Sequence, residues 1–159
     1  FRSEKQAALL VTIFGIITIL LSIFGWFYSD HPVYEAAALP FGFIGVIQLL
    51  TGGTIFLRTK NQVRRLVNLL NQSPAELAAV EIPRMEKVSK DFKNYRLLHM
   101  ILFLIGFTLL LMGSVANWGP TALGSGFGLV VQSAFMLVID LFAAWRGDLY
   151  LHKLRKICS

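Results

Sequence analysis

Four long apolar runs constrain this chain more than any other feature. They span residues 7–28, 36–57, 97–115 and 126–145. Each is about long enough to cross roughly 30 Å of hydrocarbon at about 1.5 Å per helical residue. Charged residues make up 15% of the chain, whereas soluble domains usually carry about 25%. We therefore expect an all-α membrane protein, with residues 1–159 forming a single four-span domain. The four helices would form a bundle of two hairpins.

The distribution of basic residues predicts the orientation. Nine of the fifteen Lys and Arg residues lie in the polar segment 58–96, and the other six flank the two chain ends. The short connections, 29–35 and 116–125, contain no Lys or Arg. Because cytoplasmic loops of membrane proteins are enriched in basic residues, we expect both termini and segment 58–96 in the cytoplasm. The short outer loops suit a bacterial inner membrane.

This orientation also accounts for the net charge of +6. Neither a nucleic-acid partner nor a dedicated lipid-binding role is needed to explain it. The partners that we expect are the lipid bilayer, further copies of this chain or a larger membrane complex, and a cytoplasmic protein.

Segment 58–96 is itself predicted to be a helical hairpin that extends the second and third spans into the cytoplasm. Ser73, Pro74 and Glu76 form a capping box with proline at the first helical position, which is typical of a helix start. Apolar residues recur at helical spacing on both sides of this cap. We expect the resulting seam to pair Val63, Leu66, Val67 and Leu70 with Leu77, Val80, Met85, Val88 and Phe92.

A weak internal repeat relates the second and fourth runs. Residues 42–48 read GFIGVIQ, and residues 126–132 read GFGLVVQ. A duplication would place Gln48 and Gln132 at equal depth near the centre of the bundle. An amide at that depth needs a protein partner, because lipid offers none.

Asp140 is the sharpest candidate for chemistry within the four runs. An ionised carboxylate inside a membrane is costly unless it is paired or hydrated. In one interpretation Asp140 binds a cation or carries a proton. In the simpler one it pairs with Arg58, Arg96 or His99, which lie near the same boundary, and it holds helices together.

The chain contains no HExxH, GxSxG or P-loop motif, and no metal-ligand spacing. We therefore expect no enzyme, no catalytic residue, no metal and no cofactor, although a lipid- or quinone-handling subunit remains open. The first hypothesis is a non-catalytic structural or regulatory subunit that acts through helix packing, oligomerisation and its cytoplasmic hairpin. The alternative is an oligomeric ion channel or small transporter, with Asp140, Gln132 and Gln48 forming a polar path.

Overall fold

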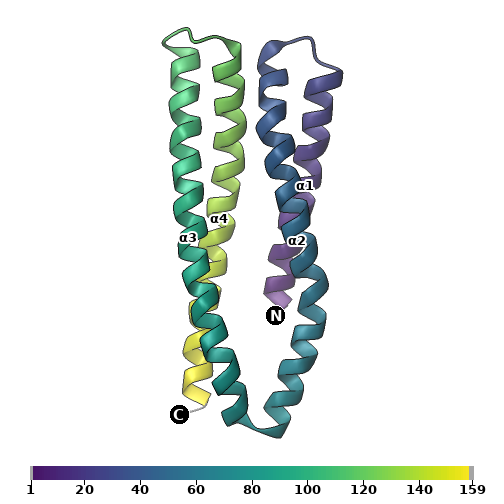
Figure 1. Ribbon diagram of the computed structural model, residues 1–159, viewed down its shortest axis with the longest axis vertical. Helices are drawn as coiled ribbons and strands as arrows, with labels where there is room; N and C mark the ends of the chain where they lie inside the picture. The colour runs from purple at the N-terminus through teal and green to yellow at the C-terminus, as the bar shows by residue number, and fades with distance from the viewer. Residues whose placement is uncertain (1, 158–159) are drawn as a thin grey trace.

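The structure is a computed structural model that describes residues 2–157, and it consists of four helices (Figure 1). They are α1 (Arg2–Phe27), α2 (Pro32–Gln72), α3 (Pro74–Ser114) and α4 (Pro120–Ile157). Side chains are described except for those of residues 2–4, 60, 69–72, 74 and 157. No strand occurs between residues 2 and 157. All four helices are long and apolar enough to cross a membrane.

The helices contact one another in the order α1, α2, α4, α3 (Figure 1). The antiparallel hairpins α1–α2 and α3–α4 stand side by side, and α2 and α4 form the interface between them. Among the described residues α1 has no contact with α3, so the bundle is open rather than closed. The two short loops lie at one end, which we call the loop end. The α2–α3 turn and both termini lie toward the other, the basic end.

Two helices begin earlier than the hydropathy pattern predicts. The second and fourth apolar runs are expected to begin at residues 36 and 126, whereas α2 begins at Pro32 and α4 begins at Pro120. Proline is favoured in the first helical turn because the amide that it lacks has no intrahelical partner there. Pro40 and Pro83 both lie inside continuous helices. The turn at 73 matches its prediction, because the Ser73 hydroxyl accepts a hydrogen bond from the Glu76 amide at 3.3 Å.

Glycines make the two hairpins tight. A Cβ atom added at Gly15 would lie 2.9 Å from the Gly45 oxygen, and one added at Gly106 would lie 2.9 Å from the Val130 nitrogen. Small residues let helix backbones approach closely, which stabilises association in lipid. Between the hairpins, a Cβ at Gly128 would lie 2.5 Å from the ring of Pro40.

The predicted seam between α2 and α3 is corrected in part: Leu66 and Leu77 do lie together, whereas α3 otherwise contacts mainly α4. Leu66 of α2 and Leu77 of α3 are buried in one cluster with Leu154 of α4. Met85 is buried, and its methyl carbon lies 3.8 Å from the position that a Cβ atom would take at Gly147 in α4. Val67 and Val80 are 48% exposed. Val63, Val88 and Phe92 are half-buried, and the side chain of Leu70 lies outside the described part.

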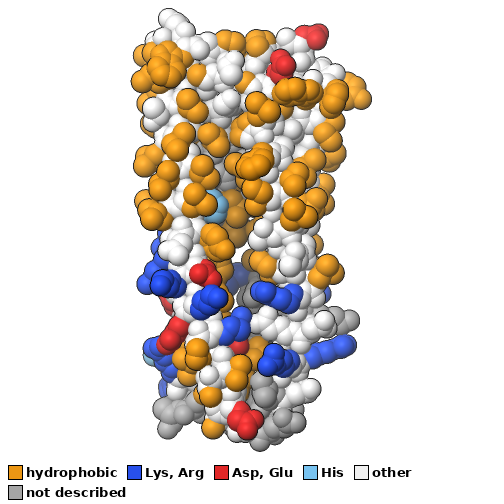
Figure 2. All heavy atoms as spheres, viewed as in Figure 1, with side chains coloured by type: hydrophobic (Ala, Val, Ile, Leu, Met, Phe, Trp, Pro, Cys, Tyr) orange, Lys and Arg blue, Asp and Glu red, His pale blue; other side chains and the backbone are white. Residues whose placement is uncertain are grey.

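The reason for this correction is the length of α4. It continues to Ile157, so its last turns offer α3 an antiparallel partner along its whole length. In Figure 1, α2 and α3 diverge from the turn at residue 73 and touch little. Figure 2 shows Lys and Arg side chains gathered over this diverging end, while apolar side chains predominate over the rest of the face that it shows, with Asp and Glu side chains at the loop end.

Candidate functional site

The two intramembrane glutamines meet at the interface between the hairpins. Gln48 Nε2 donates to Gln132 Oε1 at 2.9 Å, and Gln132 Nε2 lies 3.5 Å from the Phe41 carbonyl oxygen. The exposed fractions of Gln48 and Gln132 are 2% and 0%. Only the Gln48 Oε1 atom lacks a described partner. The pair therefore connects α2 to α4 at the place where the internal repeat puts it.

Asp140 pairs with His99, one of its three candidate partners. Asp140 Oδ2 lies 2.6 Å from His99 Nδ1, and the pair joins α4 to α3. Asp140 is 4% exposed. Neither Arg58 nor Arg96 forms an ion pair with it among the described residues, and the Arg96 Nε atom is buried without a partner. The contact gives a partner to a carboxylate that would be costly inside the membrane without one.

These two contacts lie on different sides of α4 and at different depths. Gln132 faces α2, whereas Asp140 faces α3. Eight helical residues separate them, or about 12 Å along the axis. Each side chain is enclosed by a neighbouring helix rather than open to a shared cavity. Geometrically, the arrangement suits connections between helices.

A third polar cluster surrounds Glu81 at the basic end. Glu81 is 1% exposed and accepts two hydrogen bonds from Arg84, at 2.7 and 2.6 Å. The Tyr150 hydroxyl of α4 lies 3.4 Å from Glu81 Oε1. With its amide turned to present oxygen, Gln62 of α2 accepts from Arg84 at 2.8 Å. The cluster therefore ties α2, α3 and α4 together just above the Leu66–Leu77–Leu154 contact.

Sequence reasoning missed Glu81. Glu81 and Arg84 are three residues apart, and such a pair usually lies on a solvated helix face. A signal was present, because Glu81 lies one turn from both Leu77 and Met85 on the apolar side of α3. A carboxylate in that stripe is buried if the stripe is buried.

An open cleft of about 560 Å³ lies between the diverging parts of α2 and α3. Arg58, Arg65, Arg84 and Lys87 line it, together with the carboxylates Glu81 and Asp91. Figure 2 shows Lys and Arg side chains on both sides of this hollow. Four cations face two carboxylates, which gives the lining a net charge of +2.

Within the described residues, no group of three or more His, Cys, Asp or Glu side chains is arranged to hold a metal ion. Comparison with protein-family models, with curated proteins and with solved structures found no significant match.

Proposed function

We propose that this chain is a non-catalytic integral membrane protein, a structural or regulatory subunit. It acts through helix packing, oligomerisation and docking of a cytoplasmic partner at its basic end. The observation that carries this proposal is the use of the intramembrane polar side chains. Gln48 is bonded to Gln132, and His99 is bonded to Asp140. Polar side chains that are engaged in contacts between helices hold a scaffold together.

The proposed orientation has both termini and the α2–α3 turn in the cytoplasm, in a bacterial inner membrane. Its support is the absence of Lys and Arg from the two loops that follow α1 and α3. The test uses single cysteines placed at Ala116 or Lys93, with the natural Cys158 changed to serine. An impermeant maleimide should label the cysteine at position 116 in spheroplasts. It should label the one at position 93 only after permeabilisation, and the opposite pattern would reverse the orientation.

Docking at the basic end is supported by the contacts that already order this surface in the protein alone. Leu66, Leu77 and Leu154 bury apolar surface there, and the Glu81–Arg84 cluster joins the same three helices. A preformed surface binds a partner without the entropic cost of ordering a flexible segment. The basic end is therefore suited to a protein contact.

The docking test replaces residues 63–88 with a flexible Gly-Ser linker. A matched variant replaces the loop-end residues 116–119 in the same way. Complexes extracted in mild detergent are then sized, and helical content is followed by circular dichroism. We expect partner complexes to be lost in the first variant and kept in the second. If all complexes survive both replacements, the basic end is not the docking surface.

The alternative function is an oligomeric channel or small transporter in which Asp140, Gln132 and Gln48 form a polar path. A path needs these side chains on one hydrated surface. Their exposed fractions of 4%, 0% and 2% favour the structural role. The Gln48 Oε1 atom, which lacks a described partner, is the one feature that favours the path.

A further inference from the structure

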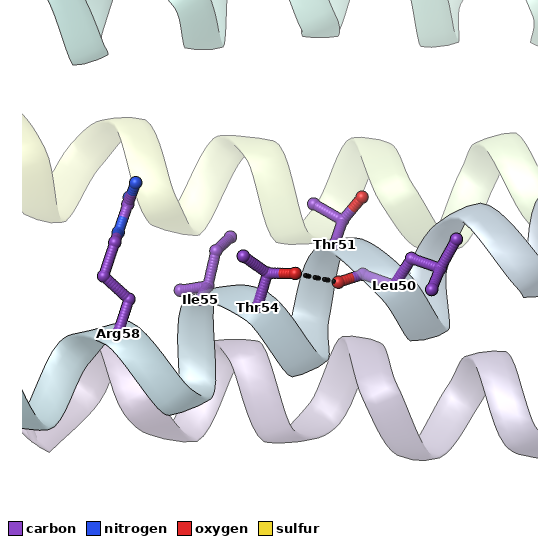
Figure 3. Close-up of a pocket in the computed structure, with 5 residues that line it drawn as sticks. All are labelled: Leu50, Thr51, Thr54, Ile55 and Arg58. Carbon is purple, nitrogen blue, oxygen red and sulfur yellow. Dashed lines mark hydrogen bonds between the residues drawn. The ribbon is translucent and has the colours of Figure 1, made fainter.

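The cleft between α2 and α3 continues into a second groove through one shared residue. Arg58 lines the cleft, and it also lines an open groove of about 320 Å³ on α2. The other residues of that groove are Leu50, Thr51, Thr54 and Ile55. Figure 3 shows their side chains along α2, with Arg58 at one end and Leu50 at the other. The basic cleft and the mainly apolar groove therefore meet at the guanidinium group of Arg58.

Three of the four cations that line the cleft have no carboxylate partner among the described residues. Glu81 is held by Arg84. Lys87 and Asp91 lie one helical turn apart but form no ion pair among the described residues. Arg58 and Arg65 likewise have no carboxylate partner in the described part of the chain. Three cations from two helices thus face one open cleft, which favours an anionic occupant.

The walls of the groove identify the apolar part of that occupant. Leu50 is 65% exposed in the part of α2 that is apolar enough to cross a membrane. The Thr54 hydroxyl donates to the Leu50 carbonyl oxygen at 2.7 Å, so it offers no free donor to a ligand. The groove consequently presents mainly carbon atoms to the bilayer. Such a surface fits an acyl chain.

The depth of Arg58 in the membrane places the cleft and the groove within reach of the same lipid molecule. Arg58 directly follows Leu57, the last residue of the second apolar run, so it lies where hydrocarbon gives way to headgroups. We propose that this composite site binds one anionic phospholipid from the leaflet at the basic end. Its phosphate lies against Arg58 with Arg65 and Lys87 beyond it, and one acyl chain follows Leu50 and Ile55. Basic pockets between membrane helices are suited to anionic headgroups. This site gives the basic residues a role beyond setting the orientation.

The test measures lipid binding to the full-length protein by native mass spectrometry, with phosphatidylglycerol and phosphatidylcholine as probes. The variant R58Q/R65Q removes two cleft cations. The matched variant R64Q/K93Q removes two exposed cations that do not line the cleft. We expect R58Q/R65Q to weaken phosphatidylglycerol binding by about 30-fold, since each basic residue near the surface contributes about fivefold. R64Q/K93Q should change it by less than about threefold. Equal losses in the two variants would show diffuse attraction and overturn the site.

Two further arms separate a lipid from a free phosphate and test the groove. T51F fills the groove without changing any charge, and it should lower phosphatidylglycerol binding while melting as the unaltered protein does. Inorganic phosphate should not compete with the lipid at millimolar concentration. If phosphate competes fully and T51F binds normally, the site takes a soluble anion and the lipid assignment is wrong. Binding that is equal for phosphatidylcholine and phosphatidylglycerol would also overturn it.

Discussion

The two hairpins of this molecule both pack closely at a glycine, and they differ in their polar contacts and in the lengths of their helices. Gly15 of α1 packs against Gly45 of α2, and Gly106 of α3 packs against Leu129 of α4. Gly45 and Leu129 are the fourth residues of the related segments 42–48 and 126–132. The contacts are offset along these segments, because the Cβ site of Gly15 meets the carbonyl oxygen of Gly45 whereas that of Gly106 meets the carbonyl oxygen of Gly126, the counterpart of Gly42. The two crossings therefore share a local geometry and differ by three residues in register.

The differences between the hairpins explain the polar features of the protein. In the first hairpin the interhelical hydrogen bond runs from the Ser22 hydroxyl to the Ala38 carbonyl oxygen, at 2.7 Å. The second hairpin contains the His99–Asp140 pair. Among the described residues, the helices of the first hairpin therefore pack together without an ion pair, and the ion pair is an addition in the second.

Length is the second difference. The helices of the second hairpin have 41 and 38 residues, whereas α1 has 26 and α2 has 41. Arg58 and Arg65, which line the cleft, lie on the part of α2 that follows its apolar run.

The largest effect that we expect is at the ion pair, where the hairpins differ most. H99L leaves Asp140 buried and unpaired, so the free energy of unfolding should fall by about 3–5 kcal/mol. Unfolding in mixed detergent micelles measures this change. T108L, at an exposed position on the same helix, should change it by less than about 0.5 kcal/mol. A loss below about 1 kcal/mol in H99L would mean that the pair does not hold the second hairpin.

The glycine crossings test what the hairpins share. G15A and G106A should each cost about 1–3 kcal/mol, because the added methyl group has no room without a shift of the helices. G53A is the matched control, since nothing lies within 4 Å of a Cβ there. It should raise stability by up to about 1 kcal/mol through helix propensity. If G15A and G106A lowered the free energy of unfolding by different amounts, the two glycine contacts would not be equivalent.

The glutamine pair tests the contact between the hairpins. Q48L removes one partner and leaves Gln132 with an unpaired buried oxygen, so unfolding should become easier by about 1–2 kcal/mol. In Q48L/Q132L no amide is left unpaired, and stability should return to within about 0.5 kcal/mol of the unaltered protein. The same unfolding assay measures the stability of both variants. Strictly additive losses would mean that the two side chains do not interact.

The smallest effect should occur at an exposed ion pair of the second hairpin. Glu86 and Arg155 lie 2.6 Å apart, but their side chains are 51% and 57% exposed. E86Q should therefore cost at most about 0.5 kcal/mol, and high salt should abolish the difference. A salt-independent loss of more than 1 kcal/mol would show that α3 and α4 depend on surface charge at the basic end.

Hydropathy and capping predicted the part of this fold that depends on local sequence. The four helices follow from the apolar runs, and the start of α3 follows from the Ser73 capping box. The earlier starts of α2 and α4 also had a local signal in Pro32 and Pro120. These features need no knowledge of which helices are neighbours.

The partners of each face could not be predicted from the sequence. The apolar stripe around Leu77 and Met85 suits α2 or α4 equally well, and the extension of α4 to Ile157 decides between them. Asp140 had three basic candidates near one boundary, and only the helix order places His99 beside it. The burial of Glu81 depends on the same choice. Such features require tertiary packing, which periodicity does not encode.

The most direct test of the central claim measures proton and cation flux through proteoliposomes that contain the purified protein. The claim is that Gln48, Gln132 and Asp140 connect helices and do not line a path. It predicts flux equal to that of empty liposomes, for the unaltered chain and for D140N alike. Flux above that background which falls in D140N would contradict the claim and establish a conduit through Asp140.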